Sequence, residues 1–189
     1  MTLTEMKKKV LGLIEELNPS SELLTDDPDI ATKINDVINQ IVFELARFKK
    51  IPDYVELEVE EGDTITFEEI KDESDYDVYQ LDVVRGVAYE LKAQGTVIKV
   101  LESGILEVEY FRYPERITEK TKEKEDKYVF ALSDDALEVA VYGIAGDLLK
   151  SDVSTEYGRI YSDRYEAMKQ LLDPRYHASY ITIDGGVSI

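Results

Sequence analysis

Residues 27–60 read DPDIATKINDVINQIVFELARFKKIPDYVELEVE, and the spacing of apolar side chains changes within this stretch. Up to Phe48 they recur every three or four positions, which predicts a helix with a wide apolar stripe. Asp27 followed by Pro28 marks its start, because the acid caps the first turn and proline needs no donor there. After Pro52 apolar residues alternate with glutamates, which predicts a strand with one charged face.

Further helices and strands are expected on either side of this stretch. Thr2 and Glu5 form a capping box in front of another helical stripe, and two more stripes follow Ser133 and Tyr157. After a turn at Glu61–Asp63 the strand pattern resumes with Ile65 and Phe67, and four further strands are expected at 79–84, 87–91, 96–101 and 105–113. Their short connections leave no room for crossover helices, so the sheet must be mostly antiparallel.

The expected fold class is α+β. Two N-terminal and two C-terminal helices are predicted to form a four-helix bundle, with an inserted, mostly antiparallel β module and an extended C-terminal tail. The predicted boundaries are 1–52 and 128–175 for the helical domain, 53–127 for the β module and 176–189 for the tail.

The composition is strongly acidic. The chain has 41 acidic and 22 basic residues, a net charge of −19, and an isoelectric point near 4.4. Between Asp53 and Asp77 twelve acids stand against one base, Lys71. This charge disfavours ordinary binding to nucleic acid or to anionic membranes. The N-terminus does not have the pattern of a signal peptide, and no apolar run approaches the ~20 residues of a membrane span.

Motifs that carry chemistry are missing from the sequence. The absence of cysteine excludes disulfides and thiolate metal sites, and His177 is the single histidine. The sequence contains no Gly-rich phosphate-binding motif, and its many acids single out no catalytic pair. Neither a cofactor nor a metal is expected.

Aromatic residues are used unevenly, with thirteen tyrosines and no tryptophan. Tyr157, Tyr161 and Tyr165 are spaced four residues apart and so share one helical face. Tyrosine suits interfaces that assemble from soluble parts, because it combines a large contact area with a polar tip. These three residues are either half-buried core residues or part of a seam between subunits.

Three stretches carry a resemblance to a known family. They are Glu109–Pro114 followed by Ile117-Thr118, then Ala145–Asp152, and then Tyr161–Tyr165. With the order of helices and strands, they resemble the head-to-tail connector proteins of tailed bacteriophages, also called adaptor or head completion proteins. The β insertion departs from the smaller all-helical adaptors.

The resemblance implies a structural virion protein and not an enzyme. Such a protein forms a homo-oligomeric ring, commonly of twelve copies. The ring binds the portal protein at the capsid vertex and connects it to neck or tail proteins, and DNA passes through its channel without specific binding. The implied location is the virion neck, after assembly in the cytoplasm of the bacterial host, with no role for a membrane.

Three groups of site residues follow from this expectation. The acids expected to line the channel are Glu56, Glu58, Glu60, Glu61 and Asp63. The residues expected at the subunit interface are Ile34, Ile38, Ile41, Tyr157, Tyr161 and Tyr165. The residues expected to bind the portal, or an adjacent copy, are Tyr176, Tyr180, Ile181, Ile183, Val187 and Ile189.

Other classes of protein remain open. An acidic cytoplasmic protein-binding or regulatory module, unrelated to virions, would share the acidity and the lack of catalytic motifs. In such a module the acidic run would be a solubilising surface. An enzyme using scattered carboxylates, for example on sugars, would need two placed acids and a cleft rich in tryptophan, which the chain lacks.

Overall fold

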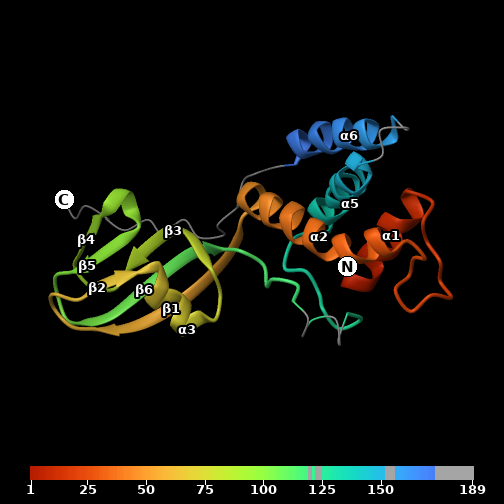
Figure 1. The fold of residues 1–189 in the computed structure, drawn as a ribbon. Helices are drawn as coiled ribbons and strands as arrows, with labels where there is room; N and C mark the ends of the chain where they lie inside the picture. Colours follow the sequence, from red (N-terminus) through yellow and green to blue (C-terminus); the bar gives the residue numbers. More distant parts are fainter. Residues whose placement is uncertain (119–120, 122–124, 152–155, 173–189) are drawn as a thin grey trace.

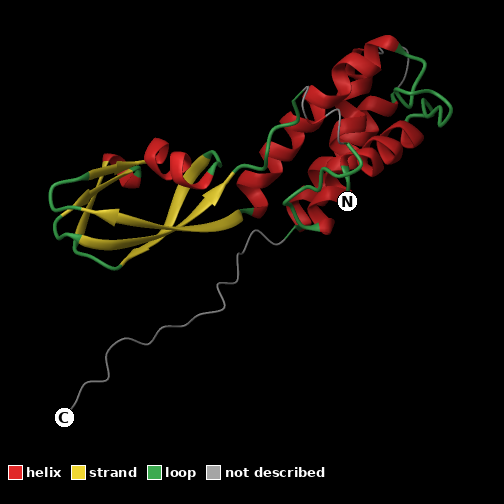
Figure 2. Ribbon diagram, turned by 90° about the horizontal axis from the view of Figure 1, so that it is seen from below, coloured by secondary structure: helices red, strands yellow, loops and turns green. Residues whose placement is uncertain are grey.

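The structure, a computed structural model, describes residues 1–118, 121, 125–151 and 156–172. Its elements are α1 (Leu3–Leu13), α2 (Pro28–Lys49), β1 (Ile51–Val59), β2 (Thr64–Thr66), α3 (Phe67–Ser74), β3 (Val78–Arg85), β4 (Tyr89–Lys92), η1 (Ala93–Gly95), β5 (Val97–Val100), β6 (Gly104–Arg112), α5 (Asp134–Leu148), η2 (Leu149–Ser151) and α6 (Tyr157–Leu171). A helical part and a β module lie end to end, as Figures 1 and 2 show.

The helical part is built around α5, against which α1, α2 and α6 each pack. The helix starts are where local chemistry predicts them. Thr2 and Glu5 form the expected capping box, and the Asp27 side chain accepts hydrogen bonds from two amides of the first turn of α2. Ala136, Leu137, Ala140 and Ile144 of α5 are fully buried, which makes this helix the centre of the helical core.

The predicted four-helix bundle is wrong. The described residues form five α-helices and two small antiparallel sheets, and one of the helices, α3, belongs to the β module. Helix α6 packs mainly against α5, and of its own residues it buries Gly158 and Tyr165. A bundle would need a broad apolar stripe on α6, whereas its Ile160 and Leu171 side chains are exposed. The extended tail predicted for 176–189 lies outside the described residues.

The β module consists of two three-stranded antiparallel sheets, in the orders β1-β6-β3 and β2-β5-β4. The chain passes between the two sheets four times, from β1 to β2, from β2 through α3 to β3, from β3 to β4 and from β5 to β6. The inner faces of the two sheets share one core. Its buried residues are Leu57, Val59, Ile65, Ile70, Val84, Ile98, Val100, Leu106, Val108 and Tyr110.

Helix α3 was not predicted from the sequence. The strand pattern was expected to continue through Ile65 and Phe67, whereas the helix begins at Phe67. Thr66 and Glu69 form a second capping box, and the chain turns into the helix at Phe67. The helix buries one residue, Ile70, so its apolar pattern is too sparse to be recognised. The Thr-x-x-Glu capping signal was nevertheless present in the sequence.

Aromatic side chains join the helical part to the β module. The ring of Tyr113 lies between those of Phe43 and Tyr79, with centroid distances of 5.1 and 4.9 Å. The Tyr79 hydroxyl donates a hydrogen bond to the carbonyl of Ala46 in α2, at 2.8 Å. These contacts hold β3 and the end of β6 against α2, in addition to the two chain connections, from α2 into β1 and from β6 toward α5. Among the described helices, none is long and apolar enough to cross a membrane.

Candidate functional site

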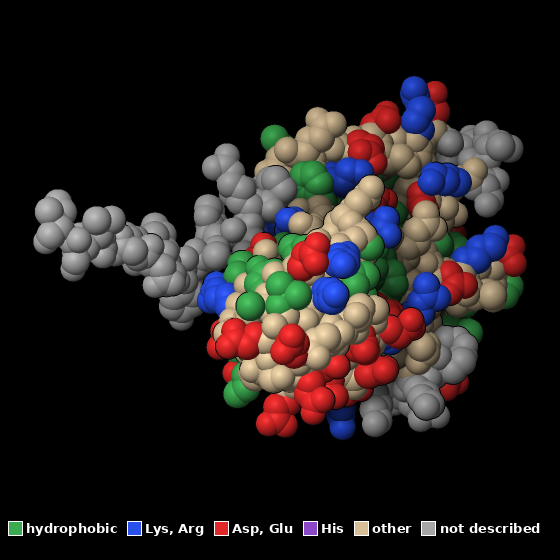
Figure 3. All heavy atoms as spheres, turned by 90° about the vertical axis from the view of Figure 1, so that its left-hand side faces the viewer, with side chains coloured by type: hydrophobic (Ala, Val, Ile, Leu, Met, Phe, Trp, Pro, Cys, Tyr) green, Lys and Arg blue, Asp and Glu red, His purple; other side chains and the backbone are tan. Residues whose placement is uncertain are grey.

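The outer face of the β1–β6 pair carries a row of glutamates. Side chains alternate between the two faces of a strand, so Glu56 and Glu58 of β1 point away from the core, as do Glu107 and Glu109 of β6. We call these four residues the acidic face. Figure 3 looks onto the β module, and acidic side chains gather along one side of it.

The register of the strands places like charges opposite each other. Glu56 is the direct partner of Glu107, and in such a pair the Cβ atoms lie about 4.5–5.5 Å apart. Like charges directly opposite each other on neighbouring strands destabilise a sheet. Arg85 of β3 forms an ion pair with Glu109, at 3.0 Å, and offsets part of this repulsion.

Tyr54 reports the negative potential at this face. Its hydroxyl donates a hydrogen bond to Glu56 Oε1 at 2.6 Å. This hydrogen bond, together with desolvation and the charge of Glu107, raises the pKa of Tyr54 to about 12. Ionisation of Tyr54 would add a further negative charge beside these carboxylates, which is why its protonated form is favoured.

The five acids predicted to line a channel fall into two groups. Glu56 and Glu58 belong to the acidic face, whereas Glu60, Glu61 and Asp63 lie at the corner between β1 and β2. Asp63 closes this corner, because its carboxylate accepts a hydrogen bond from the amide of Glu60 at 2.8 Å. The amide of Glu61 donates to the Ser103 hydroxyl at 2.9 Å. All five residues are exposed.

Glu107 and Glu109 were absent from the predicted set. They lie about fifty residues beyond Glu56 in the sequence, and only the pairing of β6 with β1 brings the two pairs of acids together. A signal for them existed, because apolar residues and glutamates alternate from Leu106 to Tyr110. The strand register could not be read from that alternation.

The residues predicted for a subunit interface do not form one surface. Ile34, Ile38 and Ile41 are at most 3% exposed and belong to the chain's own helical core, so the structure corrects their assignment to a contact between copies. Tyr165 is 4% exposed and packs against α5 next to Gly143. The Tyr161 hydroxyl donates to the Leu13 carbonyl at 2.9 Å, whereas Tyr157 is 60% exposed.

The predicted portal-binding residues, Tyr176, Tyr180, Ile181, Ile183, Val187 and Ile189, lie outside the described residues. Their assignment therefore stays a prediction.

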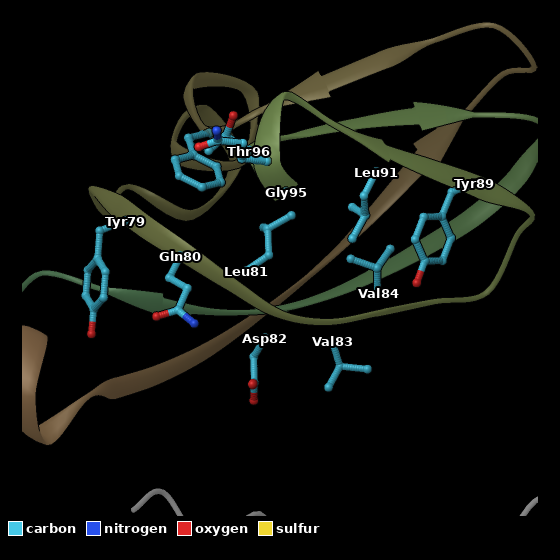
Figure 4. A pocket seen from close by; sticks show the side chains of 12 residues that line it. Tyr79, Gln80, Leu81, Asp82, Val83, Val84, Tyr89, Leu91, Gly95 and Thr96 are labelled. Carbon is cyan, nitrogen blue, oxygen red and sulfur yellow. The ribbon is translucent and has the colours of Figure 1, made fainter. Parts of the chain in front are cut away.

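A groove of about 390 Å³ runs between β3 on one side and β4 with η1 on the other. Figure 4 shows Leu81, Val84 and Leu91 between these segments, and Asp82 and Val83 on the opposite side of β3. The groove is lined by both polar and apolar side chains and contains no histidine. Across the part of the chain that the structure describes, no cluster of three or more His, Asp or Glu residues could hold a metal ion.

The described residues therefore offer two candidate surfaces, the acidic face and the groove beside β3. Comparison of the sequence with protein-family models and with curated proteins returns no match.

Proposed function

We propose that this protein is a structural adaptor that forms a ring between the portal of a tailed-phage capsid and the neck or tail, with DNA passing through the ring. The observation that carries the proposal is the acidic face, on which Glu56 and Glu107 oppose each other directly. This arrangement costs stability, so a function at this surface would account for it better than solubility, which scattered acids supply equally well.

Repulsion of DNA is the physical reason for an acidic channel wall. Duplex DNA carries one negative charge per ~1.7 Å of its axis, and each lysine or arginine that meets a phosphate adds affinity by releasing counterions. DNA that must move through a channel would be held by such contacts. A wall containing Glu56, Glu58, Glu107 and Glu109 lets it pass without binding.

The arrangement of the two parts supports the same proposal. The β module extends away from the helical part (Figures 1 and 2), and the contacts among Phe43, Tyr79 and Tyr113 fix the junction between them. One part of each copy can therefore contact the portal while the other presents the acidic face at a defined position.

The first test is assembly. Purified protein mixed with the portal protein of the phage or prophage that encodes it is expected to form rings visible by negative-stain electron microscopy. The protein alone is expected to stay monomeric in size-exclusion chromatography with light scattering, because a net charge of −19 on each copy opposes self-association. A protein that stays monomeric and unbound in the presence of the portal would contradict the proposal. It would favour an acidic module that binds another partner.

The second test reverses the charge of the acidic face. The triple variant Glu56→Lys, Glu58→Lys, Glu107→Lys is expected to bind duplex DNA, measured by fluorescence anisotropy. Its log affinity should fall with log salt concentration with a slope of up to about −3, since each phosphate contact contributes about −0.9. The unmodified protein should not bind.

The matched control reverses the charge of three exposed acids in the helical part, with the substitutions Glu22→Lys, Asp36→Lys and Asp163→Lys. This variant has the same net charge as the first and is expected to bind DNA at least about tenfold more weakly, because its lysines lie on three separate segments, the α1–α2 loop, α2 and α6, and not on one pair of adjacent strands. Equal binding by the two variants would show that net charge alone matters, and the acidic face would lose its assigned role.

A further inference from the structure

We propose that the C-terminal segment 177–183 of one copy adds as a strand to the free edge of β3 in the neighbouring copy. The inference rests on the proposed ring function and names the contact that would join adjacent subunits. The ring needs such a contact, because the isoleucines predicted for it are buried in the chain's own core.

The receiving surface is an unpaired strand edge. Strand β3 pairs with β6 along one edge, and among the described residues no strand pairs with its other edge. A free edge presents backbone N–H and C=O groups that a further strand can bind. Register shifts in its pairing with β6, between Val78 and Gln80 and between Leu81 and Val83, interrupt the strand. The shifts limit any added strand to a few paired residues.

The groove beside this edge provides places for side chains. It has a volume of about 390 Å³ and is lined by Leu81, Tyr89 and Leu91, among others. The Leu91 side chain is 48% exposed, so it is accessible to an added strand. An added strand with apolar residues at alternate positions would cover Leu91 and fill the groove.

The sequence of the C-terminal segment fits this site. Tyr180 and Thr182 alternate with Ile181 and Ile183, so a short strand would present two isoleucines on one face. Its length matches the few residues that the edge can pair. Residues 173–183 reach up to about 36 Å beyond Leu172, taking ~3.3 Å per extended residue, which is long enough to reach a neighbouring copy.

Charge also favours this segment over a contact between the folded parts. Residues 173–189 contain two acids and one base, whereas residues 1–172 contain 39 acids and 21 bases. A nearly neutral segment can approach an acidic neighbour with little repulsion. Donor segment and acceptor edge are different surfaces, so each copy gives one strand and receives one, which is the heterologous contact that a closed ring requires.

Disulfide trapping tests the inference on the full-length chain, which contains no native cysteine. A Gln80→Cys variant on the β3 edge is mixed, at a few hundred micromolar, with variants carrying one cysteine at each of positions 180–183. Heterodimers are expected at alternate tail positions and not at the positions between them, because side chains of a strand alternate. The control pairs the same tail variants with Thr64→Cys, on the exposed β2 strand.

Cross-linking to position 80 is expected to be at least about tenfold faster than to position 64, since a docked strand raises the local thiol concentration toward the millimolar range. An excess of synthetic peptide 173–189 should slow cross-linking to position 80, because the peptide would compete with the C-terminal segment for the β3 edge. Rates that do not exceed those of the control would overturn the inference. A double variant, Gln80→Cys with Thr182→Cys, that closes an intrachain disulfide in preference to disulfides between copies at the same protein concentration would also overturn it, because the segment would then cover its own edge.

The two proposals can fail separately. Rings that form with the portal but show no cross-link between positions 80 and 180–183 would refute the strand addition and leave the adaptor function standing. Specific cross-linking in a protein that forms no ring with the portal would do the reverse.

Discussion

Gly86→Ala is expected to lower the free energy of unfolding by about 4 kcal/mol, combining backbone strain with overpacking. Gly86 lies at the corner between β3 and β4 and has φ of +101°. A Cβ atom there would lie 2.1 Å from the carbonyl oxygen of Ile105, a backbone atom of β6 that cannot rotate away. The substitution must therefore distort the corner that brings the two sheets together.

Gly62→Ala is the matched control for this substitution. Gly62 lies at another corner of the same module, with φ of +99°, and a Cβ atom there would meet nothing within 4 Å. This variant should lose only the strain of a left-handed backbone, about 1–2 kcal/mol. The loss of unfolding free energy in each variant is measured by urea unfolding followed by circular dichroism. Equal losses of unfolding free energy in the two variants would mean that the close approach of Gly86 to the Ile105 carbonyl does not contribute to the stability of this corner.

Gly146→Leu is expected to cost about 3 kcal/mol, because it overpacks a close contact between two helices. A Cβ atom at Gly146 would lie 2.6 Å from the Ser162 hydroxyl oxygen and 3.0 Å from the Ser162 backbone nitrogen. Leucine at this position must push α6 away from α5, and α5 supplies most of the packing of α6. Circular dichroism should show a lower unfolding midpoint, and limited proteolysis should cut the variant faster in α6.

Gly12→Leu provides the control for the helix variant. The nearest side-chain atom to a Cβ at Gly12 is Leu17 Cδ2, at 3.9 Å, which is an ordinary contact. Because leucine is a better helix former than glycine, this variant should be stabilised by up to about 0.8 kcal/mol. A similar loss in both variants would show that the close approach of α5 and α6 contributes little to the stability of the helical part.

Local chemistry made several elements of this protein predictable. The capping box of Thr2 and Glu5 and the Asp27-Pro28 start involve groups within three residues of each other, so the sequence shows them directly. The alternation through Val55–Val59 predicts a strand with an outward acidic face, which β1 has. Short connections between strands required antiparallel pairing, and both sheets are antiparallel.

The partners of apolar faces could not be predicted in the same way. The wide stripe containing Ile34, Ile38 and Ile41 indicated a buried face, but hydrophobicity is non-directional and does not say whether the same chain or a neighbour covers it. In the structure the chain's own core covers it. Helix α6, in contrast, contacts α5 through glycines, which add nothing to a hydrophobic pattern.

The amino-acid sequence by itself determined the helix caps, the strand alternation, the antiparallel pairing and the acidic charge of this protein, because each depends on neighbouring residues or on composition. Tertiary structure decided which distant residues meet. The pairing of β1 with β6 sets Glu56 opposite Glu107, and the order of strands in the two sheets leaves the edge of β3 open beside Leu91. A register depends on the summed packing of a whole core, so no single stretch of sequence encodes it.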